Sequence, residues 1–217
     1  MASIHSKGKS HAGIYGDVIQ DFDYCVGQIV KTLKAQGIFD NTLIIITSDN
    51  GPMVKEGYID GALEHIGSHD PVGGLRGAKY SLYEGGTRMP FVVSWPKKIK
   101  HAFIQNQSFC FMDMLATLAD LTKARANKNS FNDSKSAARL FLKAETKAYR
   151  QYVITQNNSG DIAMHKGDWK YIPAYKKEPA QLYNLKTDYK EQNNVVKLTN
   201  LKSLVQEFEQ KVRQLKQ

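Results

Sequence analysis

The sequence predicts an α/β protein that ends in a small α+β subdomain. Near the amino terminus, a long run with helical spacing of apolar residues leads directly into a β-branched apolar strand. After a polar stretch, several short strand-like segments precede one amphipathic helix. We therefore divide the 217 residues into a first domain at 1–122, a linker at 123–150 and a carboxy-terminal subdomain at 151–217.

The first predicted element is a helix over residues 14–34, because apolar side chains recur there every three or four residues. The stripe consists of Val18, Phe22, Cys25, Val26, Ile29, Val30 and Leu33. Gly37 ends the helix, and residues 43–47 form a strand whose apolar composition is typical of burial on both faces of a parallel sheet. This order favours a crossover connection in a mostly parallel sheet.

Polar residues follow this strand at its carboxyl end, where open α/β sheets bind their ligands. Asp49 and Asn50 both offer oxygen atoms, which suit Ca²⁺, or alternatively Mg²⁺, better than zinc. The two residues are therefore candidate metal ligands. The alternative is a plain strand-end turn, since Asp-Asn-Gly is also ordinary turn chemistry.

Residues 73–88, GGLRGAKYSLYEGGTR, form a glycine-rich segment that contains three cationic side chains. Glycine lets the backbone approach a ligand closely. Lys79 and the arginines can present donors to a tetrahedral anion. Glu84 is the predicted ion-pair partner of Arg76 and Arg88.

The order of these motifs resembles the second half of the sulfatase family, the sulfuric ester hydrolases related to arylsulfatases. The motifs are the apolar strand, Ser-Asp-Asn-Gly, a spacer, Leu-Arg-Gly-Ala-Lys and Glu-Gly-Gly-Thr-Arg, within residues 8–123. The resemblance implies an alkaline-phosphatase-like fold with calcium ligands at Asp49 and Asn50. It also implies that Lys79 binds the sulfate group and stabilises negative charge on the leaving-group oxygen.

The resemblance further implies hydrolysis of a sulfate ester, with a sulfated carbohydrate or an aryl sulfate as substrate. His69 shortly precedes the glycine-rich segment, and we expect it to contact the alcohol portion of the substrate. A solvated loop histidine without a role is the alternative.

The nucleophile of the family has no counterpart in this sequence. Sulfatases use a formylglycine made from Cys or Ser in a Cys/Ser-x-Pro-x-Arg pattern, and Ser-Trp-Pro-Lys-Lys at 94–98 has Lys where Arg is needed. Cys25 and Cys110 lie in other contexts, and we expect buried thiols rather than a disulfide. The sequence thus resembles a carboxy-terminal half that is inactive alone. The alternatives are a non-catalytic anion-binding module and an inactive remnant.

Residues 91–95 form a second apolar strand, and residues 109–121 are predicted to be a helix. The predicted core face of that helix comprises Phe109, Met112, Leu115, Ala116, Leu118 and Ala119. Asp113 on this helix is expected to have a structural role. Residues 122–147 are polar and rich in Lys, Asn and Ser, which is typical of a linker.

The last portion is predicted to be a small antiparallel sheet closed by a helix. Strands are expected at 152–155, 162–165, 169–172 and 181–185, with a hairpin turn at 166–168. Apolar spacing from Leu201 to Leu215 then predicts the helix. The sequence Leu-Tyr-Asn-Leu at 182–185, followed by Asp188, Glu191 and Asn194, resembles a segment of the sulfatase carboxy-terminal subdomain. His165, beside the turn, is expected to be structural.

The net charge is +9, and residues 101–217 carry 19 Lys and Arg against 11 Asp and Glu. A basic surface can attract nucleic acid, membranes or sulfated polysaccharide. No interleaved aromatic-basic motif is present, so we predict no nucleic-acid partner. No apolar run reaches the roughly 18 residues of a membrane span. The first residues do not resemble a signal peptide, although the resemblance implies a periplasmic or extracellular location for a full-length family member.

Overall fold

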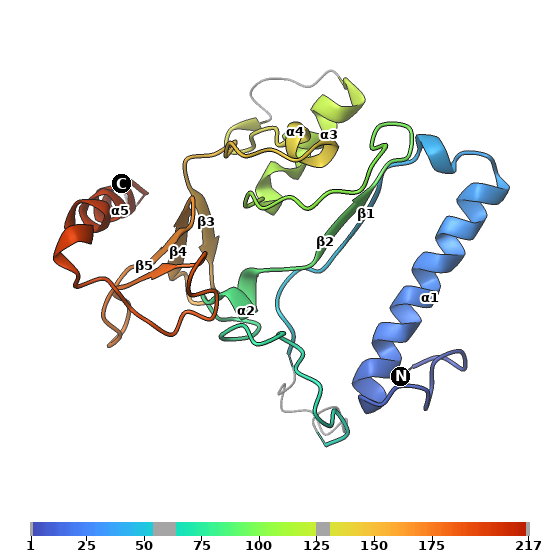
Figure 1. Cartoon of the computed structure of the whole chain (residues 1–217), viewed down its shortest axis with the longest axis horizontal. Helices are drawn as coiled ribbons and strands as arrows, with labels where there is room; N and C mark the ends of the chain where they lie inside the picture. The colour runs from blue at the N-terminus through green and yellow to red at the C-terminus, as the bar shows by residue number, and fades with distance from the viewer. Residues whose placement is uncertain (1, 54–63, 125–130, 216–217) are drawn as a thin grey trace.

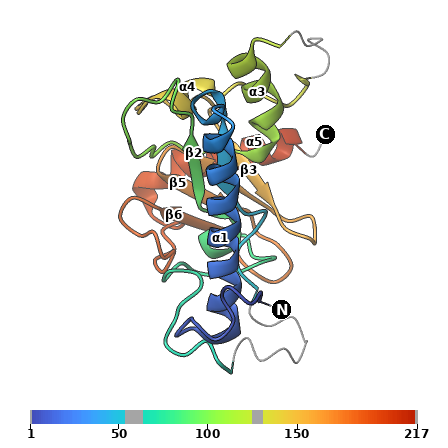
Figure 2. The same ribbon diagram turned by 90° about the vertical axis from the view of Figure 1, so that its right-hand side faces the viewer.

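The computed structural model describes residues 2–53, 64–124 and 131–215. A long helix stands at one end of the molecule, a two-stranded sheet lies in the middle, and a four-stranded sheet with a terminal helix lies at the other end (Figures 1 and 2). The predicted α/β class with a small α+β subdomain is confirmed. Among the described residues, none of the helices combines the length and the apolar character that crossing a membrane requires.

Helix α1 (Gly13–Ala35) confirms the first predicted element and is followed by the 3-10 helix η1 (Phe39–Asn41). Its apolar stripe is largely exposed, however. Val18 is 47% exposed, Phe22 53% and Ile29 57%. Figure 1 shows α1 at the edge of the molecule, away from the four-stranded sheet. The helix therefore presents an apolar face that the described part of the chain does not cover.

Strand β1 (Ile44–Thr47) pairs with β2 (Phe91–Ser94), and the register places Ile45 opposite Val93. The pairing is antiparallel, so the expectation of a parallel sheet is wrong for these strands. The long segment between them permits either direction, and apolar composition does not distinguish the two. All four residues of β1 are half-buried rather than buried on both faces.

The helix expected at 109–121 is shorter than predicted. It consists of the 3-10 helix η2 (Phe111–Asp113) and α3 (Met114–Thr122). The predicted core face is wrong in part, because Met112 and Leu115 are at least half exposed while Thr117 is buried. The α-helical part begins at Met114, five residues after the predicted start, and the tighter 3-10 turn before it does not keep the 3.6-residue periodicity on which the predicted face rests.

The segment predicted as a linker contains helix α4 (Ala138–Leu142). Its side chains pack against the two-stranded sheet and α3, and the buried members are Ala137, Leu140 and Phe141. Phe141 contacts the ring of Phe91 at 5.5 Å between centroids. The division into domains stays a prediction, but this part of residues 123–150 contributes to a core.

The four-stranded sheet confirms the predicted carboxy-terminal strands and turn. It consists of β3 (Val153–Gln156), β4 (Ile162–Lys166), β5 (Trp169–Ile172) and β6 (Gln181–Asn184), joined antiparallel in chain order. Lys166 pairs with Trp169, so Gly167 and Asp168 form a two-residue turn. Gly167 has φ +55°, as such tight hairpin turns require.

Both faces of this sheet are covered. The 3-10 helix η4 (Thr199–Leu201) leads into helix α5 (Lys202–Leu215), and Phe208 of α5 packs on one face against Met164 and Tyr171. On the other face Leu82, from the glycine-rich segment, packs against Ala163 and Ile172. The glycine-rich segment is thereby fixed on the carboxy-terminal subdomain.

Both cysteines are free thiols. Cys110 is half-buried, and burial raises its pKa above the ordinary value. Cys25 is exposed, so the expectation that it is buried is wrong. It lies on the α1 face that remains uncovered in the described residues.

Candidate functional site

The glycine-rich segment and the end of β1 interlock through their backbones. Lys79 N donates a hydrogen bond to Pro52 O at 3.1 Å, and Gly51 N donates to Gly86 O at 3.0 Å. A Cβ atom at Gly51 would lie 1.9 Å from Gly85 O, so only glycine permits this approach. The chain at 51–52, which directly follows Asp49 and Asn50, therefore lies against the backbones of Lys79 and Gly86.

Asp49 and Asn50 follow β1 in an exposed turn. Asp49 Oδ1 accepts hydrogen bonds from Asn50 N at 2.9 Å and from Ser48 Oγ at 3.3 Å. The Asn50 side-chain amide donates to Gly51 O at 2.9 Å. These bonds hold the turn at the strand tip.

The donor chemistry of the two residues fits a hard cation such as Ca²⁺, because both can offer oxygen. Their number does not, since Ca²⁺ takes six to eight oxygen ligands. Within the described residues, no three His, Cys, Asp or Glu side chains gather as a metal site would need. Asp49 and Asn50 alone thus make an incomplete donor set.

Lys79 is half-buried, and its ammonium lies 5.2 Å from the centroid of the Tyr80 ring. Tyr80 has φ +72°, a left-handed conformation that costs a residue other than glycine roughly 1–2 kcal/mol. Backbone strain of this kind gathers at functional sites. The strained residue lies directly beside the predicted sulfate-binding lysine.

His69 is exposed, and its ring lies 5.7 Å from the ring of Tyr15 on α1. This contact places His69 against the amino-terminal turns of α1. Its predicted role toward the alcohol portion of a substrate stays a prediction.

A buried ionic network lies where helix α2 (Glu84–Thr87) begins. Lys170 Nζ of β5 lies 2.9 Å from Glu84 Oε1 and 2.8 Å from Glu191 Oε1. Glu84 N also donates to Glu191 Oε2 at 2.6 Å. Lys170 and Glu191 have no solvent exposure. The network joins the glycine-rich segment to the sheet and to the chain after β6.

The two carboxylates of the network respond differently to their surroundings. Burial raises the pKa of Glu84, but Lys170 and His165 outweigh burial, so its pKa lies below 4.5. Burial also raises the pKa of Glu191 and there outweighs Lys170, so its pKa lies above 4.5. We infer that Glu84 carries the more firmly held negative charge.

His165 of β4 completes the network, with Nε2 3.6 Å from Glu84 Oε1. Burial lowers its pKa from 6.5 to about 4, although Glu84 opposes the shift, while Lys170 and Arg88 add to it. The imidazole is therefore neutral in the folded protein near neutral pH. This agrees with the structural role predicted for His165.

We expect the protein to lose stability between pH 6.5 and pH 4 through His165. Unfolded chains bind a proton at this residue in that range and folded chains do not, so stability falls as the pH drops, by about 3 kcal/mol in total. Urea unfolding at a series of pH values measures the slope.

His165→Gln is the matched control for this effect, because it removes the titration and leaves the Glu191 contribution, which has the opposite sign. An unchanged slope in His165→Gln would contradict the assignment.

Arg76 does not pair with Glu84, which corrects one predicted ion pair. Its Nη1 donates to Tyr183 OH at 3.1 Å and to Glu191 O at 2.8 Å, and its guanidinium lies 3.8 Å from the Tyr83 ring centroid. The other predicted pair is present, with Arg88 Nη1 3.5 Å from Glu84 Oε2. The two arginines thus have different partners: Arg76 binds the chain after β6, and Arg88 lies against Glu84 within its own segment.

Sequence reasoning missed Lys170, and it placed Glu191 in a family-like segment without predicting that it belongs to an ionic network. Lys170 lies between two aromatic residues in Trp-Lys-Tyr-Ile, which is also the ordinary alternation of a strand with one face in solvent, so the sequence contains no signal that it is buried. Glu191 has φ +53°, a backbone feature that sequence does not reveal.

Two family models match the chain. The model described as "Sulfatase" matches residues 4–124, and the model described as "N-sulphoglucosamine sulphohydrolase, C-terminal" matches residues 78–217. Together they include the strand tip, the glycine-rich segment and the carboxy-terminal sheet.

Curated and solved relatives agree with these models. An N-acetylgalactosamine-6-O-sulfatase of Bacteroides thetaiotaomicron is 40% identical over 205 residues, which are 88% of this chain and 40% of that protein. A solved structure from work on glycosaminoglycan metabolism by Bacteroides thetaiotaomicron superposes with a TM-score of 0.87 at 37% identity, covering 98% of this chain and 46% of the other.

A second solved structure has the same fold with lower sequence identity. That structure holds a different protein in complex with its substrate D-glucosamine-2-N,6-O-disulfate. It superposes with a TM-score of 0.69 at 20% identity, and the match covers 92% of this chain and 40% of the other. The chain thus spans less than half the length of the relatives it matches. Because the sulfatase family model matches residues 4–124 and a sulfatase is 40% identical over 205 residues, the chain belongs to the sulfatase family.

Proposed function

We propose that this chain forms the carboxy-terminal part of a sulfuric ester hydrolase that acts on a sulfated sugar. The observation that carries the proposal is the backbone interlock that joins the tip of β1 to the loop of Lys79 within the family-matched residues. It joins the backbone of Lys79 to the chain that directly follows Asp49 and Asn50, which supports a shared site for the three residues.

Each residue has a distinct task in this proposal. The Lys79 ammonium binds a sulfate oxygen and offsets the negative charge that grows on the bridging oxygen as the S–O bond breaks. Asp49 and Asn50 would hold Ca²⁺, which supplies positive charge beside the sulfate when bound. The nucleophile and the remaining metal ligands would come from an amino-terminal sulfatase segment.

The uncovered face of α1 supports such a partner segment. Ile14, Val18, Phe22 and Ile29 are each at least 45% exposed on this helix. Contiguous exposed apolar surface marks an interaction site. We propose that the amino-terminal part of the sulfatase fold covers this face.

The named relative supports a proposed substrate class. An N-acetylgalactosamine-6-O-sulfatase at 40% identity favours the 6-sulfate of an amino sugar, and aryl sulfates would serve as probes. His69 would contact the sugar portion of such a substrate. A periplasmic or extracellular location belongs to the same proposal.

A reconstituted enzyme tests the role of Lys79. The amino-terminal part of the 40% identical relative, carrying its formylglycine, is mixed with this chain, and hydrolysis of 4-nitrophenyl sulfate is followed. Lys79→Ala should lower kcat/KM about 10²- to 10³-fold, because it removes a charge that acts on the transition state.

The exposed Lys97→Ala is the matched control and should leave kcat/KM unchanged. This chain alone should not hydrolyse the probe. Wild-type turnover by the reconstituted Lys79→Ala protein would refute the site.

The alternative is a non-catalytic module that binds anions, or a remnant without activity. Calorimetric titration with Ca²⁺ and a sulfated sugar separates these two, since a module binds and a remnant does not. The interlocked strand tip favours a retained site over a remnant.

A further inference from the structure

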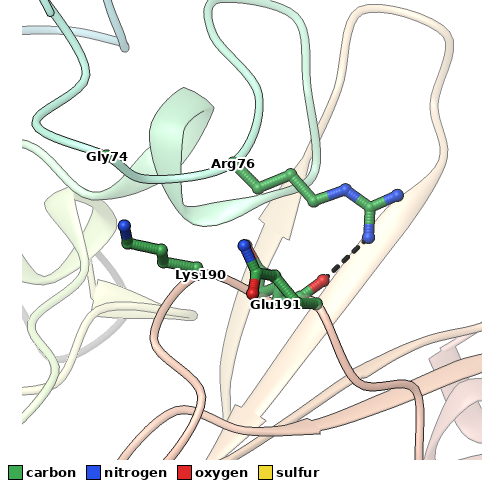
Figure 3. A pocket seen from close by; sticks show the side chains of 5 residues that line it. Gly74, Arg76, Lys190 and Glu191 are labelled. Atoms are coloured by element: carbon green, nitrogen blue, oxygen red, sulfur yellow. Dashed lines mark hydrogen bonds between the residues drawn. The ribbon is translucent and has the colours of Figure 1, made fainter.

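An open surface pocket of about 430 Å³, called the cavity below, lies between the glycine-rich segment and the chain that follows β6 (Figure 3). Its lining consists of Gly74, Arg76, Lys190, Glu191 and Gln192. None of the three residues of the proposed sulfate site lines it. Its size falls within the range of about 300–1,000 Å³ typical of small-molecule sites.

Arg76 is held rigidly at one side of this cavity. Its bonds to Tyr183 OH and Glu191 O, and its position over the Tyr83 ring, fix the guanidinium in place. A planar guanidinium that is already oriented loses little entropy when it binds an anion. The dashed line in Figure 3 marks the bond to Glu191.

Lys190 provides the second cation. Its side chain extends toward Gly74 in Figure 3, and a Cβ atom at Gly74 would lie only 3.3 Å from Lys190 Nζ. The absence of a side chain at Gly74 therefore leaves room for the ammonium. The amino group lies 5.7 Å from the centroid of the Tyr189 ring.

Glu191 does not neutralise these cations. Its side chain has no solvent exposure, and its two carboxylate oxygens bind Lys170 and Glu84 N inside the protein. The backbone of Glu191 therefore lines the cavity, whereas its carboxylate lies inside the protein. The lining contains two positive side chains and the amide of Gln192, and the carboxylates of Asp70 and Asp188 beside it accept hydrogen bonds from the backbones of Gly74 and Gln192.

We propose that this cavity binds an anionic sugar unit, sulfated or carboxylated, next to the unit whose sulfate is removed. The inference rests on the proposed function, because Arg76 precedes Lys79 by three residues in the same loop. Lys190 and Arg76 point in different directions in Figure 3, which suits an extended anionic saccharide better than one compact ion.

Calorimetric titration of the full chain tests the proposal. The probes are a chondroitin 6-sulfate tetrasaccharide, the same tetrasaccharide after chemical desulfation, and inorganic sulfate. We expect the sulfated tetrasaccharide to bind most tightly. Lys190→Gln should weaken its binding about 5-fold, as the loss of a partly exposed ion pair would.

Lys186→Gln is the matched control, because Lys186 is exposed on the same segment and lies outside the cavity. It should bind like the wild type, and Lys190→Arg should retain most of the affinity. Equal affinity of wild type and Lys190→Gln, or no binding at all, would overturn the proposal. Equal binding of the desulfated probe, which keeps its uronate carboxylates, would assign the recognition to the carboxylates rather than to the sulfates.

Lys79→Ala distinguishes this site from the proposed sulfatase site. Binding that falls in Lys190→Gln and persists in Lys79→Ala supports the cavity independently of the sulfate site. Binding that falls only in Lys79→Ala refutes the cavity and leaves the proposed function standing.

Discussion

Replacing Lys170 by methionine is expected to lower the free energy of unfolding by about 3–5 kcal/mol. Lys170 has no solvent exposure and is the cation that lies within 3 Å of both Glu84 and Glu191. Methionine fills similar volume, so the loss is chiefly electrostatic: two buried carboxylates are left facing each other without the ammonium. Urea unfolding at pH 7 measures the change.

Lys166→Met serves as the control, because Lys166 lies on the neighbouring strand and its pair with Glu207 is about one-third exposed. A pair of this kind contributes less than about 1 kcal/mol. Combining Lys170→Met with Glu84→Gln and Glu191→Gln should recover part of the loss, since the unpaired charges are then gone. If Lys170→Met costs no more than Lys166→Met, the network does not stabilise the fold.

The contacts of Lys170 could not be predicted from the sequence, whereas elements with local patterns could. The periodicity of residues 14–34 and the turn at Gly167 are local patterns, and both elements appear where they are predicted. Lys170 and Glu84 are 86 residues apart, and no local pattern specifies that they meet. Proximity in sequence predicts Arg76 and Arg88 as the partners of Glu84. Arg88 Nη1 does lie 3.5 Å from Glu84 Oε2, whereas Arg76 binds Tyr183 and Glu191.

Helix α1 illustrates a different limit. An apolar stripe predicts that a face of the helix is to be covered, but it does not say which part of a protein covers it. Phe22 and Ile29 remain more than half exposed in the described residues. The direction of the β1–β2 pair is a similar case, because apolar composition is compatible with either direction.

The candidate site was predicted from the order of motifs rather than from any single residue. Gly51 and Gly86 explain why that order is informative, since their backbones touch and bring the strand tip to the loop of Lys79. The roles of Asp49, Asn50 and Lys79 stay predictions.

Replacing Asp113 by alanine should destabilise the protein by about 3–5 kcal/mol, because it leaves a half-buried guanidinium without its partner. Asp113 is fully buried. Its Oδ1 accepts a bond from Lys135 N at 2.7 Å, and its carboxylate also binds Arg150 and Tyr149 OH. Burial raises the pKa of Asp113, but the bonds from Arg150 and Tyr149 outweigh it and hold the pKa below 3.8.

The contribution of Asp113 is therefore present above pH 4 and is lost as the pH falls through its lowered pKa. Asp120→Ala is the control, since Asp120 is exposed and accepts one bond from Ser136 Oγ. Urea unfolding at pH 7 should separate the two variants by at least about 2 kcal/mol. Faster proteolysis within residues 131–150 in Asp113→Ala alone would show that this carboxylate holds α4 against α3, whereas equal stability of both variants would mean that apolar packing around Phe141 suffices.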